Sequence, residues 1–198
     1  MTLASLSLIF FLIMDPFGNI SSFIDQLKGT SRSEYKKAVL REMLFAGIVM
    51  LVFALIGEWL LQFLQLGVPT VYISSGAILF LTSFQILFPS SKSLRNNLPK
   101  EPPYIIPLAI PLIAGPSLLA TIMLFSHEEE FFFVLLAMAI AWCLGLLILS
   151  FSHEIRSFLG ENGLLAAERL MGMILILLAI QRVAEGVILF IETIPHHG

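Results

Sequence analysis

Asp15 and Asn19 are polar residues in the middle of an apolar run, within the sequence Asp15-Pro16-Phe17-Gly18-Asn19. A carboxylate inside such a run costs about 2.5–3.5 kcal/mol on insertion scales, so we expect it to face other protein or a water-filled cavity. There it could bind an ammonium group, hold Na⁺ or take up a proton. The structural alternative is that Asp15 caps the helix that begins after Pro16. The two roles are compatible.

Pro16 and Gly18 predict a break in the helix that contains Asp15. Proline removes an N–H group and clashes with the preceding turn, and a nearby glycine loosens the rest. In a bilayer, non-helical backbone is tolerated only where it is buried in protein or lines a wet cavity. We therefore predict that residues 15–19 form half of a binding site, to which Gly18, Asn19 and Ser21 contribute.

A second interrupted stretch runs from Pro107 through Pro111 to Ala114-Gly115-Pro116-Ser117. It is predicted to supply the other half of the site, with Gly115, Ser117 and Thr121. Ser117 and Thr121 are four residues apart and so share a helical face. Exposed amides at the two half-helix N-termini could hold a carboxylate. The alternative for each hydroxyl is a hydrogen bond to the carbonyl four residues earlier.

Two glutamines and one charged pair complete the candidate site. Gln85 and Gln181 are predicted either to contact the solute or to link helices through hydrogen bonds. Arg182 and Glu185 are three residues apart on one helical face, so they are predicted to form a structural or gating pair.

The composition places these residues in a membrane protein. Of 198 residues, 58% are hydrophobic and 13% charged, whereas soluble domains have about 25% charged residues. The mean hydropathy is +0.94. A spanning helix needs about 20 apolar residues. The predicted spans are residues 3–24, 38–64, 68–88, 105–125, 131–151 and 164–191.

Basic residues are concentrated in alternate connections between these spans. Ten of the 11 Lys and Arg residues follow this pattern, and only Arg182 lies inside a span. The ten are Lys28, Arg32, Lys36, Lys37, Arg41, Lys92, Arg95, Lys100, Arg156 and Arg169. The positive-inside rule predicts that their loops are cytoplasmic and that both termini lie outside, in the periplasm.

The two halves of the chain resemble each other at an offset of 96 residues. Five of ten positions in 76–85 are identical to those in 172–181, including Gly76/Gly172, Leu79/Leu175 and Gln85/Gln181. The glycines are expected to permit close helix packing. We predict a single membrane domain of two repeats, about 1–98 and 99–198. Because each repeat has three spans, the second must be inverted relative to the first, an arrangement found in transporters with broken helices.

Other function classes have little support in the residue pattern. The four histidines have no metal-ligand spacing, and no Gly-rich phosphate loop is followed by Lys. An intramembrane hydrolase would need Ser or Asp paired with His or a second Asp deep in the membrane, and only Asp15 is available there. The charge near residues 28–41 is explained by topology, so no nucleic-acid partner is expected. We predict no enzyme activity, no cofactor and no resident metal; Na⁺ near Asp15 is a candidate coupling ion.

These motifs resemble the MarC family of six-span bacterial inner-membrane proteins, which are also grouped as neutral amino acid transporters. The resemblance covers essentially the whole chain and rests on residues 15–19, on the run from Pro107 to Ser117, and on Glu168-Arg169-Leu170-Met171-Gly172. Asp15 stands where the family often has Asn, and Ser117 where it usually has Gly. The resemblance implies uptake or export of small neutral amino acids.

The sequence therefore predicts an all-α polytopic protein whose first and fourth helices are broken and hold a small neutral solute between them. Alternating access coupled to H⁺ or Na⁺ is the expected mechanism. The alternatives are a non-transporting scaffold or regulatory protein, and a channel. The lipid bilayer is the expected surrounding, and a homo-oligomer is compatible with the sequence.

Overall fold

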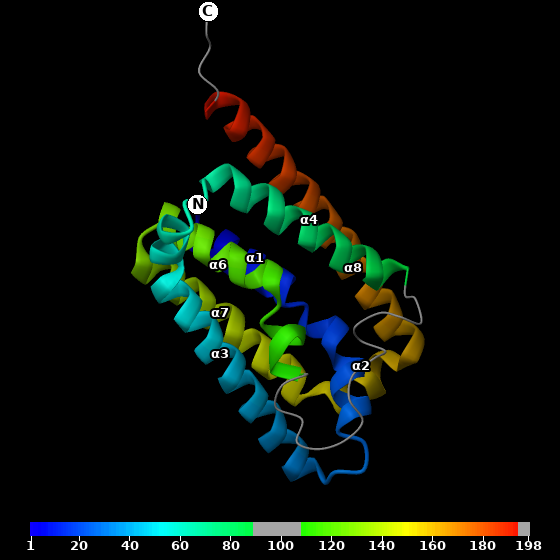
Figure 1. Cartoon of the computed structure of the whole chain (residues 1–198). Coiled ribbons are helices and arrows are strands. Elements are labelled where there is room, and N and C mark those ends of the chain that lie inside the picture. Colours follow the sequence, from blue (N-terminus) through cyan, green and yellow to red (C-terminus); the bar gives the residue numbers. More distant parts are fainter. Residues whose placement is uncertain (89–107, 194–198) are drawn as a thin grey trace, which may run out of the picture.

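The computed structural model describes residues 1–88 and 108–193, and every regular element in these two ranges is a helix. The helices are α1 (Leu3–Met14), α2 (Pro16–Gln26), α3 (Arg32–Phe63), α4 (Val68–Leu87), the short π-helical segment η1 (Leu108–Ile113), α6 (Pro116–Glu128), α7 (Phe131–Ser150) and α8 (Ser152–Thr193). They form an elongated bundle (Figure 1). The all-α fold class is confirmed.

Within residues 1–88 and 108–193, five helical stretches are long and apolar enough to cross a membrane, counting α1 with α2 as one. They match the predicted first, second, third, fifth and sixth spans. The predicted fourth span is divided between η1 and α6, and residues 105–107 of it lie outside the described residues. Ile110 within η1 has the extended backbone angles φ −133° and ψ 124°. The first and fourth spans are therefore both broken, as predicted.

Two spanning helices extend beyond their predicted starts. α3 begins at Arg32 rather than at residue 38, because Ser31 and Glu34 form a reciprocal capping box that starts the helix in polar sequence. α8 begins at Ser152 rather than at residue 164 and bends at Gly160, whose φ of 69° is unfavourable for other residues. The prediction followed only the apolar residues, and both helices continue into polar ones.

Contacts at the two ends of the bundle fit the predicted alternation of loops. The N-terminal ammonium group is 3.0 Å from Glu129 Oε1, so the N-terminus lies beside the α6–α7 turn. At the other end Arg32 forms an ion pair with Glu154, which joins two of the basic connections. Lys92, Arg95 and Lys100 lie outside the described residues. The assignment of the N-terminal end to the periplasm stays a prediction.

The core lies mainly between α1, α2, α3, α6 and α7. Its fully buried large side chains include Phe10, Met14, Phe23, Met43 and Ile122. Outward-facing side chains such as Leu55 and Leu177 are apolar and exposed, as expected of a surface that meets lipid.

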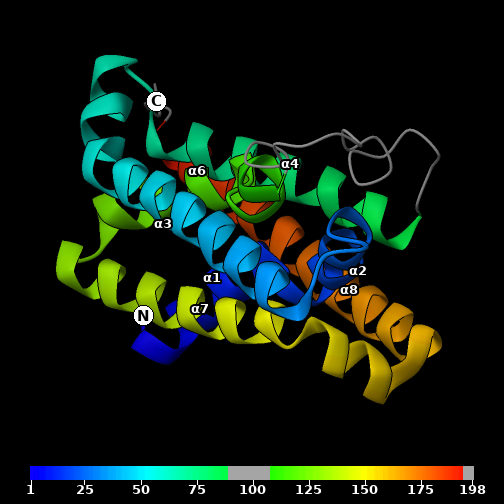
Figure 2. The same cartoon turned by 90° about the horizontal axis from the view of Figure 1, so that it is seen from below.

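Helices α4 and α8 run side by side along one edge of the bundle (Figures 1 and 2). Glycines allow this close approach: a Cβ at Gly76 would lie 2.9 Å from the carbonyl oxygen of Ala179, and one at Gly172 would lie 3.1 Å from the side chain of Leu87. The predicted packing role of Gly76 and Gly172 is confirmed.

Gly186 comes as close to the backbone of the neighbouring helix as Gly76 does. An added Cβ would lie 2.9 Å from the backbone nitrogen of Ile73 and 2.8 Å from Tyr72 Cβ. We expect Gly186→Ala to lower stability by about 1–3 kcal/mol, because α4 and α8 must move apart. Thermal unfolding of the purified protein measures this. Gly67→Ser is the control, since Ser suits this N-cap position and its Cβ meets only Pro69 Cδ at 3.5 Å. Equal melting temperatures for both variants would contradict the prediction.

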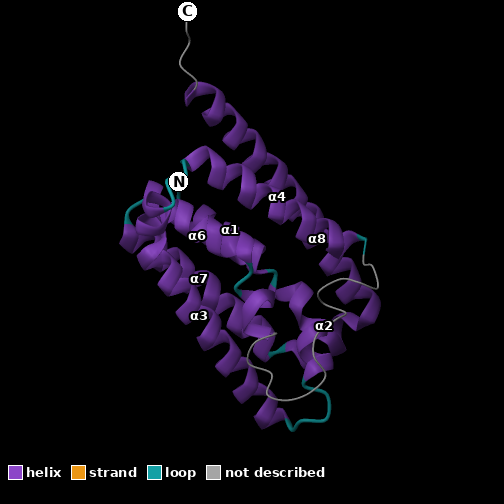
Figure 3. Ribbon diagram, viewed as in Figure 1, coloured by secondary structure: helices purple, strands orange, loops and turns teal. Residues whose placement is uncertain are grey.

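The breaks of the first and fourth spans lie next to each other in the centre of the bundle (Figure 3). A hydrogen bond joins them directly, from Asn19 Nδ2 to the carbonyl oxygen of Leu112. The predicted boundary between repeats at 98/99 lies outside the described residues. The inverted repeat relation stays a prediction.

Candidate functional site

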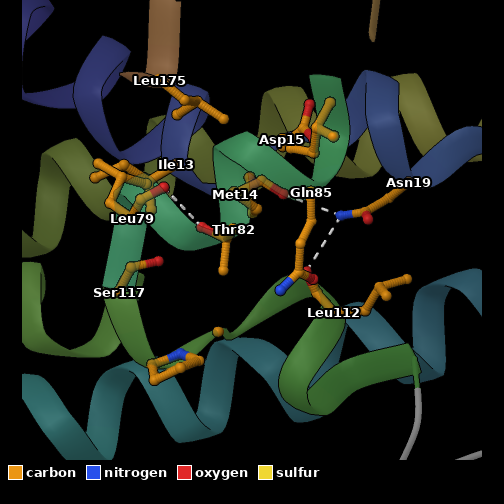
Figure 4. Close-up of a pocket in the computed structure, with 13 residues that line it drawn as sticks. Ile13, Met14, Asp15, Asn19, Leu79, Thr82, Gln85, Leu112, Ser117 and Leu175 are labelled. Carbon is orange, nitrogen blue, oxygen red and sulfur yellow. Dashed lines mark hydrogen bonds between the residues drawn. The ribbon is translucent and has the colours of Figure 1, made fainter. Parts of the chain in front are cut away.

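A cavity of about 170 Å³ lies where the two breaks meet (Figure 4). It is lined by Ile13, Met14, Asp15, Asn19, Leu79, Thr82, Gln85, Ile86, Leu112, Gly115, Pro116, Ser117 and Leu175. Five of the predicted site residues are in this set: Asp15, Asn19, Gln85, Gly115 and Ser117. Most other lining side chains are apolar. The site is small compared with the pockets of about 300–1,000 Å³ that drug-sized ligands occupy.

Asp15 is the residue at which the first span changes direction. Its backbone is left-handed, with φ 46° and ψ 60°, and it ends α1 and begins α2. Its Oδ1 accepts a hydrogen bond from the amide of Gly18 at 3.1 Å. The predicted capping role is therefore confirmed, and Gly18 contributes its amide to this cap. The side chain is only 4% exposed although it lines the cavity.

Asn19 joins the two breaks. Its Nδ2 donates to the carbonyl oxygen of Met14 at 3.0 Å and to that of Leu112 at 3.3 Å. Both carbonyls have lost their normal helical donors: Gly18 N–H is used by Asp15, and Pro116 has no N–H to give to Leu112. The Asn19 amide thus replaces hydrogen bonds that the breaks remove, as the membrane environment requires.

The fourth span resumes at α6 with its first turn against the cavity. Gly115 is the N-cap and Pro116 the first helical residue, and Gly115, Pro116 and Ser117 all line the cavity. Helix N-termini carry partial positive charge and unpaired N–H groups. This end of the cavity therefore favours negatively charged groups.

Thr82, Leu79 and Leu175 were missed as cavity residues by the sequence interpretation. Thr82 precedes Gln85 by three residues on the same face of α4, a spacing that could have indicated it. Its hydroxyl donates to the carbonyl of Leu79 at 2.9 Å. Leu79 and Leu175 are equivalent at the 96-residue offset and both line the cavity, but nothing in their types distinguishes them from core leucines.

The model of a protein family described as "MarC family integral membrane protein" matches residues 1–191 of the chain. The chain belongs to the MarC family. The "UPF0056 inner membrane protein YhgN" of Escherichia coli K12 is 44% identical over 186 residues, which are 92% of this chain and 94% of that protein. A "UPF0056 membrane protein" of Buchnera aphidicola subsp. Baizongia pistaciae is 42% identical over 188 residues, with the same two shares. No solved structure matches.

The predicted resemblance is thus confirmed. The MarC chain is an integral membrane protein that crosses the bilayer several times, and the family and the name of the Escherichia coli relative support the inner membrane as its location. A more distant relative, a "UPF0056 membrane protein" of Chlamydia pneumoniae, is 33% identical over 190 residues, which are 93% of each chain.

Ser21 and Thr121 of the MarC chain do not line the cavity. Ser21 instead donates to Glu168 Oε1 on α8 at 2.9 Å. It follows Asn19 by two residues, about 200° around the helix, so the two side chains cannot face the same space. Thr121 is buried and donates to the carbonyl of Ser117 at 2.7 Å, the intrahelical alternative stated for it above. Their predicted direct contact with solute has no support in this geometry.

Gln181, Arg182 and Glu185 are also placed outside the cavity. Gln181 is exposed and donates to Glu185 Oε1 at 2.8 Å. The predicted Arg182–Glu185 pair is absent from the ion pairs of the described residues. Position 182 points inward, whereas Gln181 and Glu185 share a neighbouring face of α8.

Arg182 is held by aromatic rings. Its side chain is 6% exposed, and its guanidinium carbon lies 4.7 Å from the ring centre of Phe125 and 5.4 Å from that of Tyr72. Its Nη1 and Nη2 atoms have no hydrogen-bond partner among the described residues. The Tyr72 hydroxyl donates to Glu128 Oε2 at 2.9 Å, which brings an acidic group into the same cluster. Cation–π contacts therefore take the place of the predicted ion pair.

Proposed function

We propose that this MarC protein is a secondary transporter of small neutral solutes, most simply neutral amino acids, across the inner membrane. The observation that carries the proposal is the cavity between the two broken spans, where Asn19 ties the breaks together and Asp15 lines the wall. Broken helices at mid-membrane are a recurring basis of transporter sites. A cavity of about 170 Å³ suits a small solute.

Alternating access is the mechanism that this arrangement supports. Asp15 and Gly115 are non-helical junctions, so the half-helices on either side of them can reorient with little loss of helical hydrogen bonding. A solute at the junctions then faces one side of the membrane or the other. Asp15 is proposed to couple the movement to H⁺ or Na⁺, because it is a buried carboxylate at the hinge itself.

The experiment is uptake of radiolabelled L-alanine into proteoliposomes that contain the purified full chain. We expect accumulation against the alanine gradient when a proton or Na⁺ gradient is imposed, saturation with alanine concentration, and no accumulation in protein-free vesicles. Flux that only follows the gradient and does not saturate would indicate a channel. No flux, together with no shift of the melting temperature by any small neutral solute, would indicate a scaffold.

A further inference from the structure

A buried cluster of aromatic and charged side chains joins three of the helices that line the cavity. It consists of Tyr72 on α4, Phe125 and Glu128 on α6, and Arg182 on α8. The guanidinium carbon of Arg182 is 5.4 Å from the ring centre of Tyr72 and 4.7 Å from that of Phe125. The Tyr72 hydroxyl donates to the Glu128 carboxylate, whose two oxygens lie at 2.9 and 3.0 Å. These four residues form the Arg182 cluster.

The Arg182 cluster lies about two helical turns from the cavity on each of the three helices. On α4 and α8 its members are seven residues from the cavity-lining leucines Leu79 and Leu175, and on α6 Phe125 is eight residues from the cavity-lining Ser117. At 1.5 Å per residue these separations are all about 10–12 Å. The direction is the same in each helix, toward the end of the bundle where Glu129 binds the N-terminal ammonium group. The cluster therefore lies between the cavity and this N-terminal end.

The helix segments between the cluster and the cavity are closely packed. Ile122 on α6 and Ala179 on α8 are fully buried. Gly76 brings α4 onto α8 at this level, since a Cβ there would lie 3.0 Å from Arg182 Cβ. The rings of Phe10 and Phe125 meet edge to face, with 6.0 Å between their centres. A solute in the cavity could reach the N-terminal end by this path only if the helices moved apart.

Arg182 is buried in this cluster without a hydrogen bond from its terminal nitrogens. Nη1 and Nη2 have no partner among the described residues. The ring faces stabilise the cation, but N–H groups that are left unbonded away from water cost free energy. Water that entered between separated helices would hydrate these groups. The buried charge therefore favours separation of the helices, whereas the ring contacts and the hydrogen bond from Tyr72 to Glu128 favour the closed arrangement.

We propose that the Arg182 cluster is the gate that closes the cavity toward the N-terminal end, with the hydrogen bond from Tyr72 to Glu128 as its latch. This deepens the proposed transport function and rests on it, because alternating access needs a barrier on each side of the site in turn. The gate is closed in this structure. Because α4 and α8 pack closely on each other, the pair moves away from α6 when the gate opens, which breaks the latch and lets water reach Arg182.

The test measures how fast a thiol in the cavity reacts with a membrane-impermeant methanethiosulfonate reagent added to one side of the membrane. Thr82 lines the cavity and is replaced by cysteine in a Cys143→Ala background, which removes the one native cysteine. Right-side-out and inside-out vesicles present the two sides. Gln62→Cys, exposed at the end of α3, identifies the side on which the N-terminal end lies. This measurement needs neither a solute nor transport.

Tyr72→Phe removes the latch and keeps the ring beside Arg182. We expect the thiol at position 82 to react about 10-fold faster from the N-terminal side and no faster from the other side, because a hydrogen bond to a charged group no longer holds the gate closed. Ser75→Ala is the matched control. Its hydroxyl lies on the same helix but donates to the carbonyl of Tyr72 rather than to α6, so its loss should leave the rate unchanged.

Arg182→Met should change the rate in the opposite direction. It removes the buried charge and keeps a long, flexible side chain against the rings, so the closed gate loses its unbonded N–H groups. We expect the reaction from the N-terminal side to slow about 10-fold. Melting temperatures of both variants show whether they fold as the wild type does.

These outcomes separate the gate from the transport function. Equal rates for the wild type, Tyr72→Phe and Ser75→Ala would overturn the gate, as would a reaction of Tyr72→Phe that is faster from both sides alike, which shows general loosening. A faster reaction of Arg182→Met would overturn the assignment of the opening force to Arg182. The alanine uptake of the wild type is measured separately, so the transport function stands or fails by that result and not by these rates.

Discussion

Asp15→Asn is expected to abolish gradient-driven accumulation of L-alanine in proteoliposomes and to leave the protein folded. Asn is as good an N-cap as Asp and also tolerates the left-handed backbone that position 15 adopts. The variant thus keeps the cap on Gly18 and removes the ability to carry charge or a proton. Alanine should at most equilibrate across the membrane, because transport would no longer be driven. Uptake under a proton or Na⁺ gradient is the measurement.

The matched control for this prediction is Asp15→Ala. It loses the hydrogen bond to Gly18 and places a residue without local side-chain bonding at φ 46°. We expect it to be less stable than Asp15→Asn by about 2 kcal/mol, from the lost cap and the left-handed backbone together. Melting temperatures near wild type for Asp15→Asn and clearly lower for Asp15→Ala would separate structure from coupling. Wild-type accumulation by Asp15→Asn would remove Asp15 from the coupling mechanism.

The breaks could be predicted from sequence because their causes are local. Pro16 and Pro116 remove N–H groups whatever the surrounding fold, and the apolar context makes the freed carbonyls costly. Their meeting in space could also be predicted, since the breaks occupy corresponding places in two similar halves. In the structure, hydrogen bonds from Asn19 to the carbonyl oxygens of Met14 and Leu112 hold the two breaks together.

The direction of individual side chains could not be predicted in the same way. Ser21 and Gln181 lie close in sequence to positions that point inward, but each faces another part of the structure. For Ser21 the two-residue spacing from Asn19 already indicated a different face of the helix. Around Gln181 the helix is apolar on nearly all sides, so the hydrophobic pattern does not show which face is buried. The apolar lining residues, such as Leu79 and Leu175, were hidden for the same reason. Arg182 shows a further limit: a pair of opposite charges at helical spacing was predicted to meet, but the rings of Tyr72 and Phe125 are closer partners.

Asn19→Ala should cause the largest loss of stability of any single polar substitution at the breaks. It leaves the carbonyl oxygens of Met14 and Leu112 without the donor that replaces their helical partners. A buried acceptor left unsatisfied costs about 1–3 kcal/mol, so the two together should cost about 2–6 kcal/mol. Thermal unfolding in detergent is the measurement.

Two variants identify the cause of that loss. Asn19→Asp has almost the same shape but cannot donate when ionised, so it should be destabilised as well. Ser21→Ala removes one hydroxyl on the opposite face of α2 and should lose much less stability. If Asn19→Asp and Asn19→Ala both melt as the wild type does, the donor to the two carbonyls is not needed. The breaks would then be held together by the apolar packing around them.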